Sequence, residues 1–142
     1  MRCIPSYREV MVALLMTCAG ACAELAQGAM PGLLAGGEWI VERVAGATAG
    51  GDRRARISFA ADGQVTGSGG CNRLMGRAEI GSETITFGAL ATTRMACPPE
   101  VMQQERKLLD ALSATRSYRI ADVTLTLHDA SGAELVRLTR QT

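Results

Sequence analysis

The sequence predicts an α+β fold, in which a small antiparallel β-barrel or strongly curled sheet packs against one amphipathic helix. Three observations support this prediction. Most apolar runs alternate with polar residues at a period of two, short turn signals separate the runs, and a single segment shows helical spacing. Short gaps join antiparallel neighbours, because a parallel pair needs a crossover of a dozen residues or more. A sheet of this size cannot leave both faces in water, so we expect it to curl with the helix as its cover.

The clearest predicted strand covers 123–128, where apolar and polar residues alternate. We expect the apolar residues to share one buried face, namely Val123, Leu125 and Leu127. The polar residues are expected to share the opposite face, namely Thr124, Thr126 and His128. Similar runs lie at 38–44, 55–59, 64–66, 74–80, 84–87 and 134–139. The turn signals between runs are Asp62-Gly63, Gly81-Ser82, Ala121-Asp122 and Ser131-Gly132. The pattern predicts an antiparallel meander.

One segment, from Pro99 to about Leu112, breaks the alternation. Its apolar residues recur at helical spacing behind a proline that suits the first turn of a helix. They are Val101, Met102, Leu108, Leu109 and Leu112. We therefore expect one amphipathic helix inserted between strands.

The aromatic residues Trp39, Phe59 and Phe87 are expected in the core, because aromatic rings tend to be buried. An exposed aromatic binding platform is the alternative. An aromatic content of only 4% disfavours it.

The N-terminal residues predict export. Arg2 and Arg8 precede an apolar run, 10–23, which falls short of the roughly 20 apolar residues of a membrane span and ends in small residues. A buried N-terminal helix is the alternative. The sequence thus predicts a signal peptide at 1–21, a tether without periodicity at 22–34 and one domain at 35–142.

Two endings of the signal peptide stay open. Ala19-Gly20-Ala21-Cys22 resembles a bacterial lipobox, in which the cysteine is lipidated and becomes the new N-terminus, although a lipobox prefers Leu where Ala19 stands. Ordinary cleavage after Ala21 or Ala23 is the rival, because both sites have a small-x-small form. We favour lipidation of Cys22, which would attach the protein to a membrane. The expected location is the periplasm or, lipid-anchored, the bacterial outer membrane.

Charge and composition disfavour several classes of function. The exported part holds 13 basic and 13 acidic residues without basic clusters, so electrostatics give no reason to expect nucleic acid as a partner. The chain has one His, no nucleophile beside a base and no phosphate-binding glycine pattern. We therefore predict no catalytic residue, no metal site and no cofactor.

Cys71 and Cys97 are the thiols of the predicted domain. Two thiols in an oxidising compartment usually form a disulfide, which here would contribute roughly 3 kcal/mol in the chain-entropy model. Reduced cysteines are the next alternative. A zinc site is disfavoured, because only His128 and scattered carboxylates could complete it. Redox catalysis would want a closely spaced pair such as Cys-x-x-Cys.

Glu105 lies in the middle of the apolar stripe of the predicted helix. A carboxylate is costly there unless it is paired. We expect it to be largely buried and to accept hydrogen bonds from Arg73, Arg94 or amides of the cysteine loops, which would pin the helix to the barrel. The alternatives are a carboxylate that reaches solvent and, third, a catalytic acid. Asn72 is expected to tie down its own backbone, with a ligand contact as the alternative.

The order of motifs resembles a known family. It runs from Gly37-Glu38-Trp39 through Asp62-Gly63-Gln64-Val65-Thr66-Gly67 into Gly70-Cys71-Asn72-Arg73, then through Thr93-Arg94-Met95-Ala96-Cys97 and a helix with Glu105 to a Leu125-Thr126-Leu127 strand. Over about 34–140 the chain looks like the META domain of HslJ-like bacterial envelope proteins. The resemblance implies a small, cracked antiparallel β-barrel with a helix, exported or lipid-anchored and associated with heat shock and the cell envelope. It implies no catalytic residues.

Two classes of function follow. The first is a non-enzymatic envelope protein that serves stress tolerance or envelope assembly by binding a protein partner or a small hydrophobic ligand. The second is an envelope enzyme, either a hydrolase or a thiol redox protein, with an unrecognised site. An apolar cleft between barrel and helix would favour binding, whereas converging titratable groups with shifted pKa values would favour catalysis.

Overall fold

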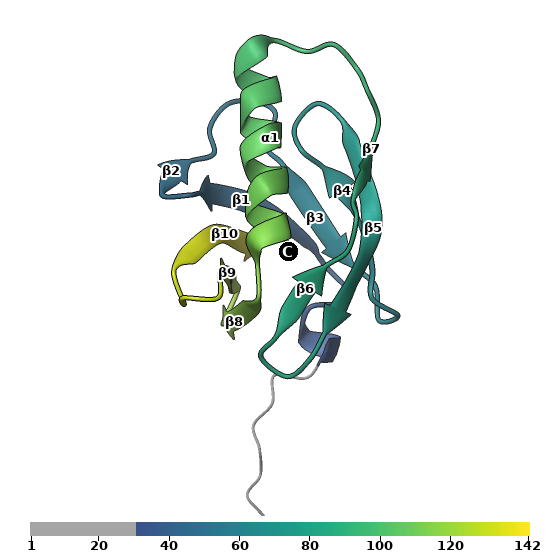
Figure 1. Cartoon of the computed structure of the whole chain (residues 1–142), viewed down its shortest axis with the longest axis vertical. Coiled ribbons are helices and arrows are strands. Elements are labelled where there is room, and N and C mark those ends of the chain that lie inside the picture. Colours follow the sequence, from purple (N-terminus) through teal and green to yellow (C-terminus); the bar gives the residue numbers. More distant parts are fainter. Residues whose placement is uncertain (1–30) are drawn as a thin grey trace, which may run out of the picture.

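The computed structural model describes residues 31–142 and shows one helix packed against a strongly curled antiparallel sheet (Figure 1). The predicted signal peptide, the first part of the tether and the lipidation site Cys22 lie outside the described residues. Between residues 31 and 142, no helix is both long and apolar enough to cross a bilayer.

Short strands follow one another with tight connections, and one helix interrupts them. In chain order the elements are η1 (Pro31–Leu33), β1 (Glu38–Val44), β2 (Ala47–Thr48), β3 (Arg56–Phe59), β4 (Gln64–Ser68), β5 (Arg73–Ile80), β6 (Ile85–Phe87), β7 (Ala91–Thr92), α1 (Pro99–Ala114), β8 (Ser117–Ala121), β9 (Thr124–His128) and β10 (Glu134–Arg140). Pro99 starts the helix without losing a hydrogen bond, because the first amides of a helix have no partner within it. All predicted strands and the predicted helix are present, with ends shifted by one or two residues at most.

The strands form one antiparallel sheet in the order β6-β5-β4-β3-β1-β10-β9-β8, with β2 paired to β1 and β7 to β5. The two outer strands, β6 and β8, approach each other. A bridge joins Thr84 to Ser117, and the Tyr118 N–H donates to the carbonyl of Glu83 (2.9 Å). The sheet is therefore nearly closed, with a seam between β6 and β8, which confirms the predicted cracked barrel.

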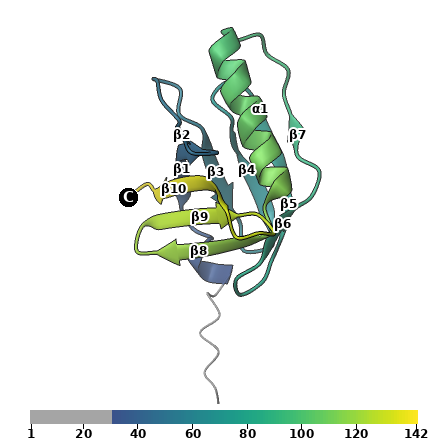
Figure 2. The ribbon, with the colours of Figure 1, turned by 60° about the vertical axis from the view of Figure 1, so that its left-hand side comes forward.

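The sheet turns sharply between its two halves. The strands β8, β9 and β10 run across the direction of β3, β4 and β5 (Figure 2). The register of β1 against β10 shifts between Val41 and Arg43, and such a bulge bends a strand and increases its twist. This curvature brings α1 over one side of the barrel.

The interior contains the predicted aromatic residues. Trp39 on β1 is fully buried, and its indole N–H donates to the carbonyl of Leu34 (3.0 Å). Phe59 and Phe87 are buried with ring centroids 6.2 Å apart. Leu34 is the last residue of the predicted tether, yet it is fully buried, so the folded unit takes in the end of that segment.

The prediction that Val123 shares a buried face with Leu125 and Leu127 is wrong for Val123, which is 46% exposed. The strand β9 begins one residue later, and Val123 belongs to the turn after Asp122, whose φ is 53°. A residue in a tight turn does not follow the alternation of the strand. Leu125 and Leu127 are fully buried, as predicted.

Three strands lie outside the predictions, namely β2, β7 and β8. The first two have two residues each, which is too short to show a period. The third reads Ser-Tyr-Arg-Ile-Ala, where only Tyr118 and Ile120 carry the alternation. Its pairing with β9 along all five residues explains why this weak segment is a strand.

Candidate functional site

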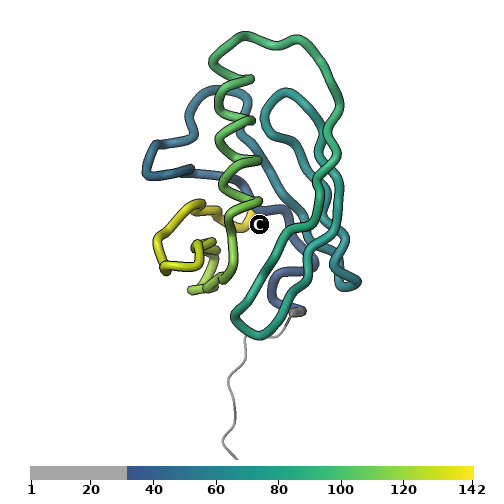
Figure 3. The backbone as a smooth tube through the Cα atoms, viewed as in Figure 1, coloured from purple at the N-terminus to yellow at the C-terminus, as the bar shows by residue number. Residues whose placement is uncertain are grey.

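The residues singled out from the sequence meet where α1 begins. Cys71 lies in the loop between β4 and β5, and Cys97 lies in the segment that leads from β7 into α1. They form the predicted disulfide, with Cα atoms 6.1 Å apart. The tube in Figure 3 shows this segment passing from β7 to the start of the helix. The bond therefore ties the start of α1 to the sheet.

Asn72, next to the disulfide, is buried and connects three parts of the chain. Its Nδ2 donates to Glu105 Oε1 on α1 (2.7 Å), and its backbone N–H donates to Glu105 Oε2 (2.8 Å). Its Oδ1 accepts from the Thr93 hydroxyl (3.1 Å) and from the Met95 N–H (2.7 Å). We call Asn72, Glu105, Thr93 and Met95 the Asn72 clasp. The prediction that Asn72 ties down its own backbone is wrong, because its side chain joins α1 to the segment before it.

Glu105 is 5% exposed, which confirms that it is largely buried. Both of its oxygens accept hydrogen bonds from Asn72, one of them from the backbone amide of the cysteine loop, as predicted. A buried carboxylate needs such donors, because burial without them removes its hydration at a high cost. The described contacts of Glu105 thus account for its position on the apolar face of the helix.

Of the predicted donors, the loop amide of Asn72 contacts Glu105, whereas Arg73 and Arg94 do not. Both side chains are exposed. Arg73 lies between buried Asn72 and buried Leu74, and the alternation of a strand directs it to the outer face. Its backbone N–H donates to the Thr93 hydroxyl (3.0 Å), so it supports the clasp only through its main chain.

Gly69 makes room for Glu105, a role that the sequence did not reveal. A Cβ on Gly69 would lie 2.4 Å from Glu105 Cγ and 2.6 Å from Oε2. The Gly69 N–H also donates to the carbonyl of Asn72 (3.0 Å), which closes the loop that presents Cys71. Gly70 has a φ of +110°, as expected of a glycine in this connection.

Arg53 is the charged residue that contacts the disulfide, and no pattern along the chain indicates this contact. It lies before β3, far from both cysteines in the chain, and its Nη1 is 3.6 Å from Cys97 Sγ. Both cysteines are partly exposed. Within residues 31–142, no three His, Cys, Asp or Glu side chains come close enough together to hold a metal ion.

A groove of about 240 Å³ separates α1 from the chain that follows β6. Leu90 and Leu109 are half-buried on its two sides. The rest of its lining is small or polar: Gly88, Ala89, Asp110 and Ser113. This groove lies between barrel and helix, and two leucines contribute to its lining.

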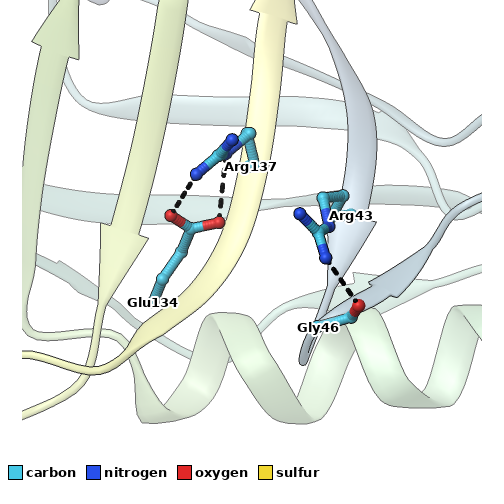
Figure 4. Close-up of polar contacts among 4 residues, drawn as sticks. All are labelled: Arg43, Gly46, Glu134 and Arg137. Atoms are coloured by element: carbon cyan, nitrogen blue, oxygen red, sulfur yellow. Dashed lines mark hydrogen bonds and ion pairs between the residues drawn. The ribbon is translucent and has the colours of Figure 1, made fainter.

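The polar contacts on β1 and β10 are exposed and join residues that are close together in the chain. Arg137 donates to both carboxylate oxygens of Glu134 (3.1 and 2.7 Å), and Arg43 donates to the carbonyl of Gly46 (3.0 Å) (Figure 4). The hydrogen bond with Glu134 raises the pKa of Arg137 above its ordinary value. Exposed pairs of this kind contribute little to stability.

The META domain family model matches residues 32–142. A protein solved by NMR is 25% identical, with a TM-score of 0.63 over 77% of this chain and 92% of that one. A protein from Burkholderia xenovorans, also solved by NMR, is 24% identical, with a TM-score of 0.61 over 79% of this chain and 86% of that one. A crystallised DUF4847 family protein from Bacteroides vulgatus is 16% identical, with a TM-score of 0.60 over 79% of this chain and 99% of that one. No curated protein matches the chain.

Proposed function

The chain belongs to the META domain family, and from this premise we propose that it is a non-enzymatic exported protein of the bacterial cell envelope. In this proposal it serves stress tolerance or envelope assembly by binding a protein partner or a small hydrophobic ligand. The role in stress and in the envelope rests on the resemblance to HslJ-like proteins. The mode of action rests on the surface between barrel and helix.

The disulfide supports export. Disulfides persist in oxidising compartments and are rare where cellular reductants keep thiols reduced. Cys71 and Cys97 are partly exposed, so cytosolic reductants could reach this bond. A periplasmic location would preserve it, in agreement with the signal peptide that the first residues predict.

The groove beside α1 is the single observation that carries the binding proposal. Its two leucines come from different elements, Leu90 from the chain after β6 and Leu109 from the helix. Both are only half-buried, so an occupant could cover the rest of their apolar surface and gain about 25 cal/mol for each Å² removed from water. Asp110 and Ser113 at the rim offer polar contacts that would orient the occupant.

Site-specific photocrosslinking in cells tests the binding proposal. A photoreactive amino acid at Ser113, on the groove rim, should capture a protein or a lipid-like molecule when the full chain is expressed in its own envelope. The matched control is Ser131, which is exposed in the turn between β9 and β10. Adducts that form equally at both positions, or at neither, would reject the groove as the binding surface.

Intact-mass analysis tests export. We expect a mature chain that begins at Cys22 with a diacyl mass increment, or one that begins at Cys22 or Glu24 without it. A cytosolic protein that keeps residues 1–21 would contradict the proposal.

A further inference from the structure

We propose that the Cys71–Cys97 disulfide is a thiol-exchange site, at which an incoming thiol attacks Cys71 and Cys97 departs. The reactant is a thiol of a small molecule or of a thiol–disulfide oxidoreductase. The exchange modifies this chain itself, so it is independent of what the groove binds.

The two sulfurs lie in opposite electrostatic surroundings. Cys97 Sγ is 3.6 Å from the guanidinium Nη1 of Arg53, which favours negative charge on that sulfur. Cys71 Sγ is 3.7 Å from the carbonyl oxygen of Met95, which disfavours negative charge there. When the bond breaks, the electron pair should therefore move to Cys97.

The position of Cys97 adds to this asymmetry. It lies two residues before Pro99, where α1 begins, and the start of a helix carries partial positive charge. The better-stabilised thiolate is the better leaving group in thiol–disulfide exchange. Arg53 supplies the specific contact, and the helix start contributes in the same direction.

Atoms and electrons balance over two exchange steps. A thiolate attacks Cys71 Sγ, the S–S bond breaks, and the products are a mixed disulfide on Cys71 and a thiolate on Cys97. A second thiol then attacks the mixed disulfide, so that two external thiols are oxidised to one disulfide while the protein pair is reduced. In the reduced protein, Arg53 still faces the Cys97 thiolate, and the Cys71 S–H can donate to the Met95 carbonyl. Both contacts favour the reduced state, so the bond should be easier to reduce than it would be without Arg53.

The Asn72 clasp should hold the cysteines near each other after reduction. Asn72 follows Cys71 directly, and its Oδ1 accepts from Met95, two residues before Cys97. Its bonds to Glu105 fix the same loop against α1. None of these hydrogen bonds involves a sulfur atom, so reduction leaves them in place and the pair can re-form.

Mapping of the mixed disulfide tests the direction of attack. The purified, oxidised protein is treated with reduced glutathione, quenched in acid, alkylated and digested for mass spectrometry. We expect the glutathione adduct on Cys71 and the alkyl group on Cys97. Adducts that occur on Cys97 as often as on Cys71 would overturn the proposal.

Substitution of Arg53 tests whether its guanidinium makes Cys97 the leaving group. Arg53→Ala should slow reduction by glutathione and shift the equilibrium towards the disulfide by about two- to fivefold, the range of one exposed ionic contact. Arg53→Lys should restore most of the effect, and Arg54→Ala, which alters the adjacent exposed arginine, should behave as the parent protein. Equal rates and equilibria for Arg53→Ala and Arg54→Ala would overturn the assignment. Thermal midpoints of the oxidised variants verify that each one is folded.

Discussion

The first half of α1 buries a single residue, Glu105, whereas the second half buries Leu108, Ala111 and Leu112. Val101 and Met102, the apolar residues of the first half, are only half-buried. The first half is held by the Asn72 clasp and, through the segment before it, by the Cys71–Cys97 disulfide. The second half is held by apolar packing.

The two halves of α1 therefore differ in the substitutions that they tolerate as well as in what stabilises them. Apolar packing accepts exchanges between apolar side chains of similar volume at a moderate cost, because neighbouring side chains can adjust. A buried hydrogen-bonded carboxylate does not, because a lost or misdirected donor leaves a polar group without a partner. The first half of α1 therefore depends on a few residues of fixed chemistry.

The largest effect is expected in the second half of the helix. Leu112 is fully buried, and Leu112→Ala should lower the free energy of unfolding by about 2–5 kcal/mol through lost burial and the cavity left behind. Chemical denaturation of the oxidised protein measures it. Arg106→Ala, an exposed change on the same helix, is the control and should stay within about half a kcal/mol. A similar midpoint for both variants would mean that the core under α1 can collapse around the missing side chain.

The disulfide should come next. The double variant Cys71→Ser/Cys97→Ser should be less stable by roughly 3 kcal/mol, because the unfolded chain regains the freedom of a closed loop. Denaturation of the parent protein with and without reductant provides an independent measure. If neither removal nor reduction of the bond moves the midpoint, the bond does not constrain the start of α1.

Glu105→Gln isolates the clasp with little change of shape. One of the two acceptor oxygens becomes an NH₂ group that faces an Asn72 donor, so the free energy of unfolding should fall by about 1–3 kcal/mol. Gln103→Ala, on the exposed side of the same helix, should cost within about half a kcal/mol.

The effect of Glu105→Gln should be different when it is measured in the variant without Cys71 and Cys97, because the clasp and the disulfide hold the same loop. Strict additivity would show that the clasp and the disulfide act independently.

The smallest effect concerns a polar contact of Tyr118 on β8, the strand that follows the helix. Burial raises the pKa of Tyr118, and the Glu83 carboxylate raises it further, while the Tyr118 hydroxyl donates to the carbonyl of Gly81 (3.0 Å). A folded pKa above the unfolded value of about 10 means that the protonated phenol stabilises the fold fully below about pH 10. This stability is lost as the pH rises through the folded pKa. The denaturation midpoint of the protein should therefore decrease as the pH is raised above about 10. Tyr118→Phe should remove the part of this decrease that Tyr118 causes.

The sequence predicted the elements whose pattern is strong along the chain. The run at 38–44 and the helix from Pro99 carry enough alternating or periodic apolar residues to be recognised without the fold. The strand β8 does not, because only its pairing with β9 makes a strand of it. Val123 shows the limit of the pattern, since the position of a turn decides where alternation begins.

The candidate site also contains residues that a local pattern reveals and residues that only the fold brings together. Glu105 was recognisable because a carboxylate inside an apolar stripe is a signal along one helix. Its partner was not, because Asn72 reaches it through the path of a loop. The outward direction of Arg73 follows from its place between Asn72 and Leu74, and that alternation could have excluded it as a partner. The contact of Arg53 with Cys97 joins segments that no local pattern relates.

The pairing of β1 with β10 also sets the order in which the protein can fold. Each strand from β1 to β6 meets a partner nearby in the sequence, and β8, β9 and β10 form a meander of their own. The register of Trp39 opposite Arg140 joins segments roughly 100 residues apart, which makes it a slow contact to form. Until β10 arrives, one edge of β1 is open to other strands, and open edges promote aggregation. A chain that loses β10 should therefore fail by self-association before it fails by loss of its remaining strands.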